Sequence, residues 1–250
     1  MSSLFERGHD GKQGGNMYSF NSKVRYSETN NKGNIYIGSI VDYLQDCSLF
    51  QSEALGIGVE YLKEKKKAWI LSSWQIVIQE DLKLGDEISI GTQAYDFKGI
   101  YGYRNFCIKD NKDKFAVLAN SVWVLVSTET GMPIKVEPED ALPYGKAEKF
   151  QMDYADRKIK ITGEPIKKDS FAIRKYHIDT NDHVNNAWYI KFAQEYLEND
   201  YKIRQIRAEY KMAAKYGNIV YPVLYLDKDK VTVALNNEEN KTYAVVEFTK

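Results

Sequence analysis

The chain has 250 residues, which is comfortable for two domains of ordinary size. Its 35 basic and 35 acidic residues cancel, so it lacks the positive excess of a dedicated nucleic-acid binder. No apolar run reaches the roughly 18 residues of a membrane-spanning helix, and residues 1–16 read as a polar, Gly-rich leader without the apolar core of a secretory signal.

The first half, residues 17–132, is expected to form a helix followed by four strands. In chain order its elements are an extended stretch at 18–26, a polar loop at 27–33, a helix at 34–55 and strands at 68–79, 87–95, 101–109 and 115–127. Within the helix, Ile37, Ile40 and Leu44 recur at three- and four-residue spacing, which is the period of an amphipathic helix.

Proline marks a break near the middle of the chain. Four of the five prolines fall within residues 128–168, a charged stretch of weak periodicity. We expect a linker at 133–168 that joins two modules. The alternative is one long loop inside a single domain, although unstructured loops of that length are uncommon in compact domains.

The second half, residues 169–250, repeats the order of the first. Its elements are an extended stretch from 171, a polar loop at 179–185, a helix at 186–199 and strands at 203–213, 219–226, 230–235 and 242–248. Asn34 and Asn186 both open a helical run, and Gly85 and Gly217 sit in similar turns between strands. These echoes predict an internal repeat. The fold class is therefore α+β, with two modules in which a curved antiparallel sheet wraps one helix.

Several common catalytic motifs are absent from the sequence. There is no G-x-S-x-G elbow, no phosphate-binding G-x-x-x-x-G-K-[ST] loop, no dinucleotide fingerprint and no C-x-x-C. Cys47 and Cys107 are expected to be packing residues, because two cysteines are too few for a disulfide framework or a zinc cluster. We expect no cofactor and a location in the reducing cytoplasm.

The polar loop before the second helix holds the candidate catalytic residues. Asp179, Asn181 and His183 occupy alternate positions, so in an extended segment all three would point the same way. A turn followed by a helix cap is the alternative, and it fits Asp182, Asn185 and Asn186 best. A metal site at His177, Asp179 and His183 is less favoured, because the spacing matches no zinc motif.

These residue types fit a hydrolytic site that contains no metal. Asp179 would activate water, His183 would transfer a proton near neutral pH, and Asn181 would orient the water or the carbonyl. The helix N-terminus, with Asn185, Asn186 and Trp188, would bind the substrate and stabilise the negative charge that develops on its carbonyl oxygen.

The run Asp-Thr-Asn-Asp-His-Val-Asn-Asn at 179–186, followed by an aromatic helix, resembles the active-site motif of hotdog-fold thioesterases. The repeated module with this motif in its second copy resembles the acyl-acyl carrier protein (acyl-ACP) thioesterases of plants and bacteria, over nearly all of the chain from residue 17. The resemblance implies a tandem (double) hotdog fold. It implies hydrolysis of the fatty acyl-ACP thioester, which releases free fatty acid and ends chain elongation. It also implies an acyl pocket in the first module and catalysis in the second.

The next strand departs from the family pattern, in which a Glu usually stands three residues after a Tyr and is sometimes followed by Cys. Here Ala213 and Ala214 occupy those positions. Glu209 is expected on the same strand face but roughly 13 Å away, too far to replace the missing carboxylate. This departure keeps a non-catalytic acyl-binding protein open as an alternative. Acyl-CoA hydrolysis is another, because acyl-CoA thioesterases of this fold share the shorter His-Val-Asn-Asn run.

Acyl carrier proteins are acidic, so a local basic patch is expected on an enzyme that binds them. One candidate group contains Arg174, Lys175, Arg204 and Arg207, and a second lies at 63–67. Either group can instead be an ordinary solvated face. We expect neither nucleic-acid binding nor membrane insertion, and the chain is expected to be a monomer or a homodimer.

Overall fold

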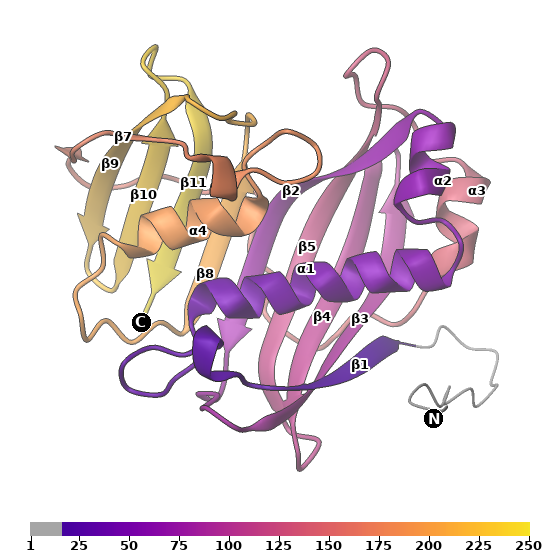
Figure 1. Ribbon diagram of the computed structural model, residues 1–250, viewed down its shortest axis with the longest axis horizontal. Helices are drawn as coiled ribbons and strands as arrows, with labels where there is room; N and C mark the ends of the chain where they lie inside the picture. The colour runs from indigo at the N-terminus through magenta and orange to yellow at the C-terminus, as the bar shows by residue number, and fades with distance from the viewer. Residues whose placement is uncertain (1–16) are drawn as a thin grey trace.

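The computed structural model describes residues 17–250, and its main feature is one antiparallel sheet of 11 strands shared by both halves of the chain (Figure 1). The leader predicted at residues 1–16 lies outside the described residues. The strand order is β1-β3-β4-β5-β2-β8-β11-β10-β9-β6, with β7 paired to β9. The strands of the first half thus lie on one side and those of the second half on the other, and they meet at β2 and β8. The predicted α+β class is confirmed.

The strands are β1 (Tyr18–Lys23), β2 (Lys67–Ile78), β3 (Glu87–Lys98), β4 (Tyr101–Asp110), β5 (Phe115–Ser127), β6 (Ile166–Lys167), β7 (Phe171–Ala172), β8 (Gln205–Tyr210), β9 (Ile219–Asp227), β10 (Lys230–Asn236) and β11 (Thr242–Thr249). The helices are α1 (Ile37–Ala54), α2 (Val59–Glu64), α3 (Pro138–Ala141) and α4 (Asn186–Gln194), with short 3-10 turns η1 (Tyr26–Glu28), η2 (Leu142–Tyr144) and η3 (Lys175–His177).

The long helices α1 and α4 lie on the same face of the sheet and bury one side each (Figure 1). Helix α1 begins at Ile37 rather than at residue 34, because Ile35 donates its N–H to the Leu82 carbonyl and so belongs to the preceding turn. Helix α4 ends at Gln194, before the expected residue 199. Beyond it the N–H of Leu197 bonds back to Gln194, three residues earlier, so the helix tightens into turns.

The two modules are joined by the antiparallel pairing of β2 with β8. The pairing runs from Ser73 opposite Glu209 to Val77 opposite Gln205. Within it Ile76 lies opposite Ile206, and both side chains are fully buried in a core cluster that extends through both modules. The helices also touch, because Lys191 of α4 forms a 2.8 Å ion pair with Asp42 of α1.

The stretch between the modules is more ordered than an unstructured linker. It contains α3, η2 and β6 and crosses the outer face of the sheet at the module junction. There Gln75 of β2 donates to the Asp153 carbonyl at 2.7 Å, and Arg207 of β8 donates to the carbonyls of Asp156 and Lys158. The linker therefore braces the junction on the face opposite the helices. Its boundaries at 133 and 168 stay a prediction.

The Ile76–Ile206 contact predicts that the modules unfold together. Replacing Ile76 with Ala should lower the free energy of unfolding by about 2–5 kcal/mol, because it leaves a cavity in the shared core. Denaturant unfolding followed by circular dichroism should still show one transition. Ile70→Ala on the same strand is the control: Ile70 is 51% exposed, and its loss should cost less than about 1 kcal/mol. Equal losses from both variants would contradict this account.

Candidate active site

The motif loop is a closed turn rather than an extended segment, so the predicted alternation of its side chains was wrong. Ile178 and Val184 form a β-bridge across its base. Inside the bridge the Asp179 N–H donates to the His183 carbonyl at 2.8 Å, and Asp182 adopts the left-handed conformation at φ 59° that closes the turn. Asp179 and His183 therefore face each other across the base of the turn.

The turn also engages one oxygen of the Asp179 carboxylate. Asp179 Oδ1 accepts the N–H of Asn181 at 2.8 Å, which fixes the carboxylate and leaves its second oxygen without a partner among residues 17–250. Asn181 lies exposed at the tip. The half-buried His183 ring likewise has no hydrogen-bond partner within the described chain. The loop thus presents a fixed carboxylate, an amide and an imidazole whose reactive atoms are unoccupied.

Asn185 caps α4, as the alternative interpretation of this loop predicts. Its side-chain oxygen accepts the Ala187 N–H at 2.9 Å, and its carbonyl accepts the Trp188 N–H at 2.9 Å. Two of the N–H groups expected to hold a carbonyl oxygen are therefore already engaged. Within the described part of the chain, the Asn186 N–H is the one group of this first turn that has no acceptor.

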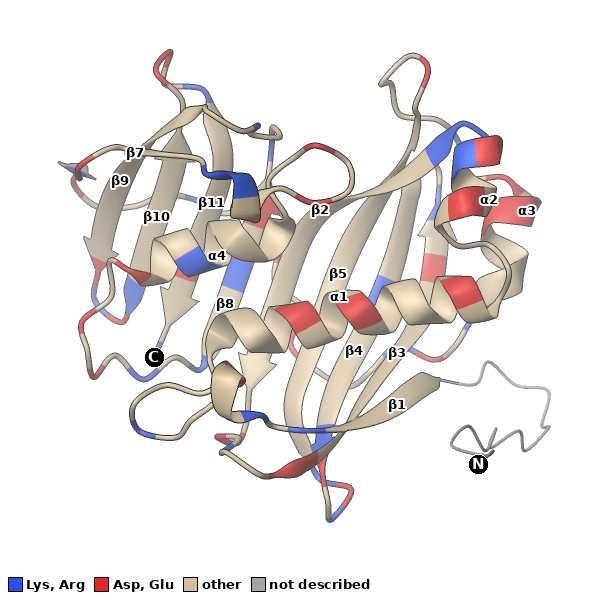
Figure 2. Cartoon of the chain, viewed as in Figure 1, with Lys and Arg blue, Asp and Glu red and all other residues tan. Residues whose placement is uncertain are grey.

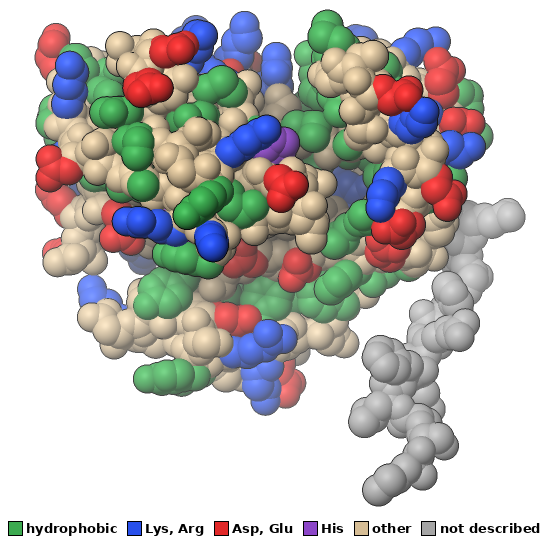
Figure 3. All heavy atoms as spheres, turned by 45° about the horizontal axis from the view of Figure 1, so that its top comes forward, with side chains coloured by type: hydrophobic (Ala, Val, Ile, Leu, Met, Phe, Trp, Pro, Cys, Tyr) green, Lys and Arg blue, Asp and Glu red, His purple; other side chains and the backbone are tan. Residues whose placement is uncertain are grey.

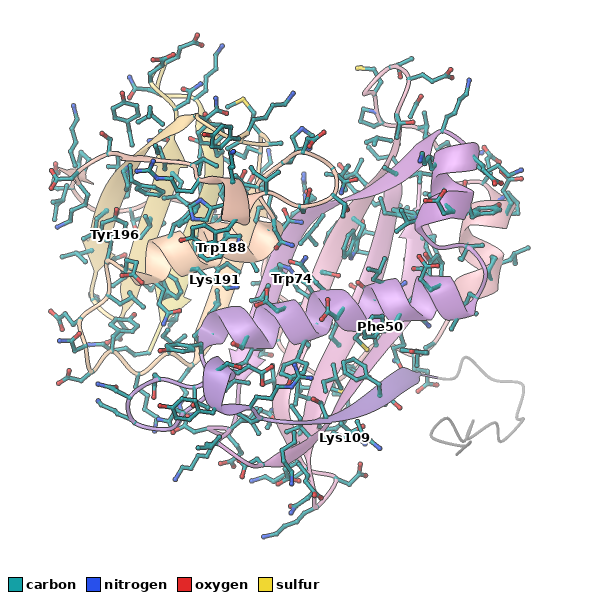
Figure 4. All side chains as sticks on the ribbon, in the orientation of Figure 1. Phe50, Trp74, Lys109, Trp188, Lys191 and Tyr196 are labelled. Carbon is teal, nitrogen blue, oxygen red and sulfur yellow. The ribbon has the colours of Figure 1, made fainter. Side chains whose placement is uncertain are left out.

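Trp188 packs behind the loop and does not donate to the site. Its ring contacts Tyr176, His177 and Phe192, and the Lys191 ammonium lies 4.7 Å from its centre (Figure 4).

His177 belongs to the same aromatic cluster. Its Nδ1 accepts the Arg174 N–H at 3.0 Å, and burial and the charge of Arg174 lower the pKa of His177. The neutral ring thus acts as a hydrogen-bond acceptor in η3.

Two tyrosines, the buried Tyr189 and the half-buried Tyr210, hold the loop against the end of β8. The Tyr210 hydroxyl donates to the Asn186 carbonyl at 3.1 Å, and the Tyr189 hydroxyl accepts the Ala214 N–H at 2.8 Å. Burial raises the pKa of Tyr189 to about 12, with a smaller contribution from the nearby Asp179 charge. The Ala214 carbonyl in turn accepts the Val184 N–H at 2.9 Å. Ala214 therefore lies directly beside the motif.

Glu209 lies on the opposite face of the sheet, so its predicted orientation was wrong. Its carboxylate accepts the Ile159 N–H of the linker at 3.1 Å on the outer face, whereas Ala208 and Tyr210 point toward the helices. The expectation failed because β8 ends at Tyr210, so strand alternation does not extend to Ala213. Asp179 is thus the carboxylate that lies across the base of the motif turn from His183.

The first module repeats the turn without its reactive groups. Thr29 and Ile35 form the bridge, Asn30 donates its N–H to the Asn34 carbonyl at 2.8 Å, and Gly33 closes the turn at φ 75°. Asn30 thus takes the place of Asp179, and Asn34 takes the place of His183 rather than that of Asn186. A cleft of about 530 Å³ opens beside this turn.

The space-filling view shows a hollow between the two modules with a histidine at the surface beside it (Figure 3). Among the described residues, no group of three or more His, Cys, Asp and Glu side chains could hold a metal ion. No helix in residues 17–250 is both long enough and apolar enough to cross a membrane.

Two family models match this chain. The acyl-ACP thioesterase N-terminal domain matches residues 15–144, and the acyl-ACP thioesterase C-terminal domain matches residues 161–247. The chain belongs to the acyl-ACP thioesterase family. The motif turn lies within the C-terminal domain of the family, and its unreactive counterpart lies within the N-terminal domain.

Similar proteins include a curated plant protein, acyl-[acyl-carrier-protein] hydrolase FATB2, chloroplastic, from Cuphea viscosissima. It is 23% identical over 199 residues, which are 73% of this chain, and the match spans about half (48%) of the plant protein.

Among solved structures, an acyl-ACP thioesterase from Bacteroides thetaiotaomicron aligns with a TM-score of 0.86 at 19% identity, over 93% of this chain and 97% of that one. A putative oleoyl thioesterase from Lactobacillus plantarum aligns at 0.82 and 23% identity, over 94% and 96% of the two chains. The 12:0-ACP thioesterase from Umbellularia californica aligns at 0.80 and 15% identity, over 96% and 98%. These likenesses confirm the double hotdog fold.

Some of the predicted carrier-docking residues are engaged in contacts of the fold, and others are exposed. Arg207 forms a 3.0 Å ion pair with Glu247 and binds the linker on the outer face, so it offers no free charge. Arg204 precedes β8, at the end of the strand away from Ala213.

Arg174 and Lys175 are exposed and immediately precede the motif loop, where basic residues are visible beside α4 in Figure 2. In the second group, at 63–67, Lys66 and Lys67 are paired with acids.

The Asn185 cap predicts a stability effect distinct from catalysis. Replacing Asn185 with Ala should cost about 0.5–2 kcal/mol of unfolding free energy, because the Ala187 N–H loses its acceptor. Asn185→Ser should recover most of the loss, since its hydroxyl can cap the same group. Thermal and denaturant unfolding would measure both variants.

Asn181→Ala is the matched control, because the exposed Asn181 side chain makes no hydrogen bond within the described residues. Its stability should equal that of the wild type. An Asn185→Ala protein as stable as the wild type would show that the cap contributes nothing.

Proposed function

We propose that the chain is a thioester hydrolase that releases free fatty acid from fatty acyl-ACP and so ends chain elongation in fatty acid biosynthesis. The observation that carries the proposal is the closed turn, which holds Asp179 opposite His183 beside the free N–H of Asn186. Membership of the acyl-ACP thioesterase family supports the substrate class, and the name of the plant relative supports the reaction.

The first step is the attack of water on the thioester carbonyl. The free oxygen of the Asp179 carboxylate accepts a proton from water as the water oxygen bonds to the carbonyl carbon. The Asn181 amide orients the water or the substrate. The carbonyl oxygen becomes negative and is stabilised by the N–H of Asn186 at the start of α4, where the helix dipole adds to the hydrogen bond.

The second step is the collapse of the tetrahedral intermediate. The carbonyl re-forms, the carbon–sulfur bond breaks, and His183 donates a proton to the departing sulfur of the carrier's thiol. The carboxyl group of the released fatty acid contains the water oxygen. His183 suits this role because an imidazole can exchange a proton near neutral pH. With Ala213 at the position where the family usually has Glu, Asp179 acts as the only carboxylate.

The turn predicts a large loss of turnover in two variants. Asp179→Asn and His183→Ala should each lower kcat by about 10²- to 10⁴-fold on acyl-ACP thioesters, because each removes a proton-transfer group. Free-thiol release would measure the rates, and circular dichroism would establish that both variants are folded.

Asn34→Ala provides the matched control. Asn34 occupies the place of His183 in the first-module turn, so its loss should leave kcat/KM unchanged. Full activity in His183→Ala would refute the assigned site. Binding of acyl-ACP without turnover in the wild type would instead favour the acyl-binding alternative, and equal turnover on CoA and carrier thioesters would favour the acyl-CoA alternative.

Carrier docking is proposed at Arg174 and Lys175, which lie beside the mouth of the site. Lys175 reaches to 5.9 Å from the Tyr216 ring, which brings the exposed Lys215 into the same patch. The double variant Arg174→Glu, Lys175→Glu should raise KM for acyl-ACP about tenfold at low salt, because the acidic carrier is repelled. KM for the matching acyl-CoA should change much less.

Lys112→Glu is the control for this charge reversal. Lys112 is exposed in the turn between β4 and β5, remote from the motif loop. Its reversal should leave KM for acyl-ACP unchanged. If both reversals raised KM for acyl-ACP equally, only the net charge of the protein would affect carrier binding. That result would contradict the docking assignment.

The cytoplasm is the proposed location, because both Cys47 and Cys107 are free thiols. Burial raises the pKa of Cys47 to about 12 and that of Cys107 to about 11, so neither is a reactive thiolate. We propose a monomer or a homodimer, since the β2–β8 pairing already joins the sheets of the two modules.

A further inference from the structure

One row of residues in the first module places polar groups in its otherwise apolar interior. The strand registers put Trp74 of β2 opposite Ser121 of β5, Ser121 opposite Arg104 of β4, and Arg104 opposite Ala94 of β3. All four residues are at most 7% exposed. Because Arg104 contacts Gln51 of α1, the row lies on the face of the sheet that α1 covers.

Arg104 is a buried cation without a carboxylate partner among the described residues. One guanidinium nitrogen donates to the side-chain oxygen of Gln51 and, at 3.3 Å, to the Thr92 hydroxyl. The Tyr144 ring lies 4.8 Å from the guanidinium carbon. Buried charges in proteins are normally paired with an opposite charge. The interior of this module therefore holds a positive charge whose anion is absent from the described chain.

Trp74 supplies a second unmatched donor in the same row. Its ring packs against Phe106 with centroids 4.8 Å apart, and its indole N–H is buried with no acceptor in the described residues. Most buried indole N–H groups find a partner. A buried charge without a counter-ion and an indole N–H without an acceptor, both in one row, favour a ligand that brings its own oxygen.

The row leads away from the motif turn. Tyr210 of β8 bonds to Asn186 at the start of α4, and Ala208, two residues earlier on the same face, lies opposite Trp74. Trp74 therefore lies next to the catalytic end of β8, near the point where α1 and α4 meet (Figure 4). Arg104 lies two strands farther into the first module, roughly 10 Å beyond Trp74 at the usual strand spacing.

We propose that Arg104, assisted by Trp74, selects acyl chains that carry a hydrogen-bond-accepting oxygen, a hydroxyl or a carboxylate, at the end remote from the thioester. The inference rests on the proposed thioesterase function and names its substrate class. A saturated chain along this row would leave the guanidinium and the indole N–H facing methylene groups. An oxygen at that depth would accept from them, and sites built to hydrogen-bond a substrate group reject analogues that lack it.

The test compares two matched series of carrier thioesters, one saturated and one with a terminal hydroxyl or carboxylate, over a range of chain lengths. In the wild type, kcat/KM at the best length should favour the oxygenated chain by about 10- to 100-fold, as expected for a hydrogen bond to a charged group. Arg104→Met keeps an unbranched apolar stem but is shorter and removes the donors and the charge. It should abolish this preference and accelerate the longer saturated chains.

Arg207→Met is the matched control, because Arg207 is also held by side-chain and backbone contacts but faces the outer side of the sheet. It should leave the preference ratio unchanged. Trp74→Phe keeps the packing on Phe106 and removes only the N–H, so it should lower the ratio several-fold even if Arg104→Met fails to fold. A wild-type ratio near one at every length would overturn the inference without any variant.

Failure of the proposed function can be distinguished from failure of the subsite inference. If no thioester is hydrolysed, calorimetric binding of a saturated fatty acid and of its terminally hydroxylated and dicarboxylic counterparts tests the subsite alone. Tighter binding of the oxygenated acids by the wild type, lost in Arg104→Met, would support the subsite. Equal affinities for all three acids would reject it.

Discussion

The antiparallel pairing of β2 with β8 is the contact on which the rest of the structure depends. It turns two modules into one sheet, buries Ile76 against Ile206, and gives both helices a common face to cover. It also determines what surrounds the candidate site. The motif turn belongs to the second module, yet through β8 it lies near β2 of the first.

Duplication explains why a chain with two similar turns has one set of reactive residues. Both turns share a bridge at the base, a left-handed residue near the tip and a hydrogen bond to the segment that follows β2 or β8. The first keeps this geometry with Asn30 and Asn34, and the second places Asp179 and His183 at the same points. The backbone is thus a common scaffold, and two side chains distinguish the proposed catalytic turn from its counterpart in the first module.

Sequence reasoning predicted those features that depend on local periodicity. The start of α4 at Asn186, the strands of both modules and the repeat itself follow from apolar spacing and turn residues. The shape of the motif loop could not be predicted in this way, because Asp and Asn favour both extended and turn conformations. The bridge between Ile178 and Val184 and the hydrogen bond from Asn181 to Asp179 decide between them.

Features that depend on tertiary contacts could not be predicted from the sequence. Strand alternation was extended from Glu209 to Ala213, but β8 ends at Tyr210, so Glu209 was assigned to the wrong face. Arg207 appeared to be a surface charge, but its ion pair with Glu247 on the next strand makes it structural. The buried Arg104 carries no local signal at all, since only the position of α1 over β4 encloses it.

The most direct test of the central claim is a crystal structure with an acyl-ACP mimic in which an amide replaces the thioester. The account predicts that the amide carbonyl lies at the Asn186 N–H between Asp179 and His183, with the acyl chain running past Trp74 beneath α1. A ligand seated instead in the cleft beside Asn30 and Asn34, with the motif turn empty, would contradict it.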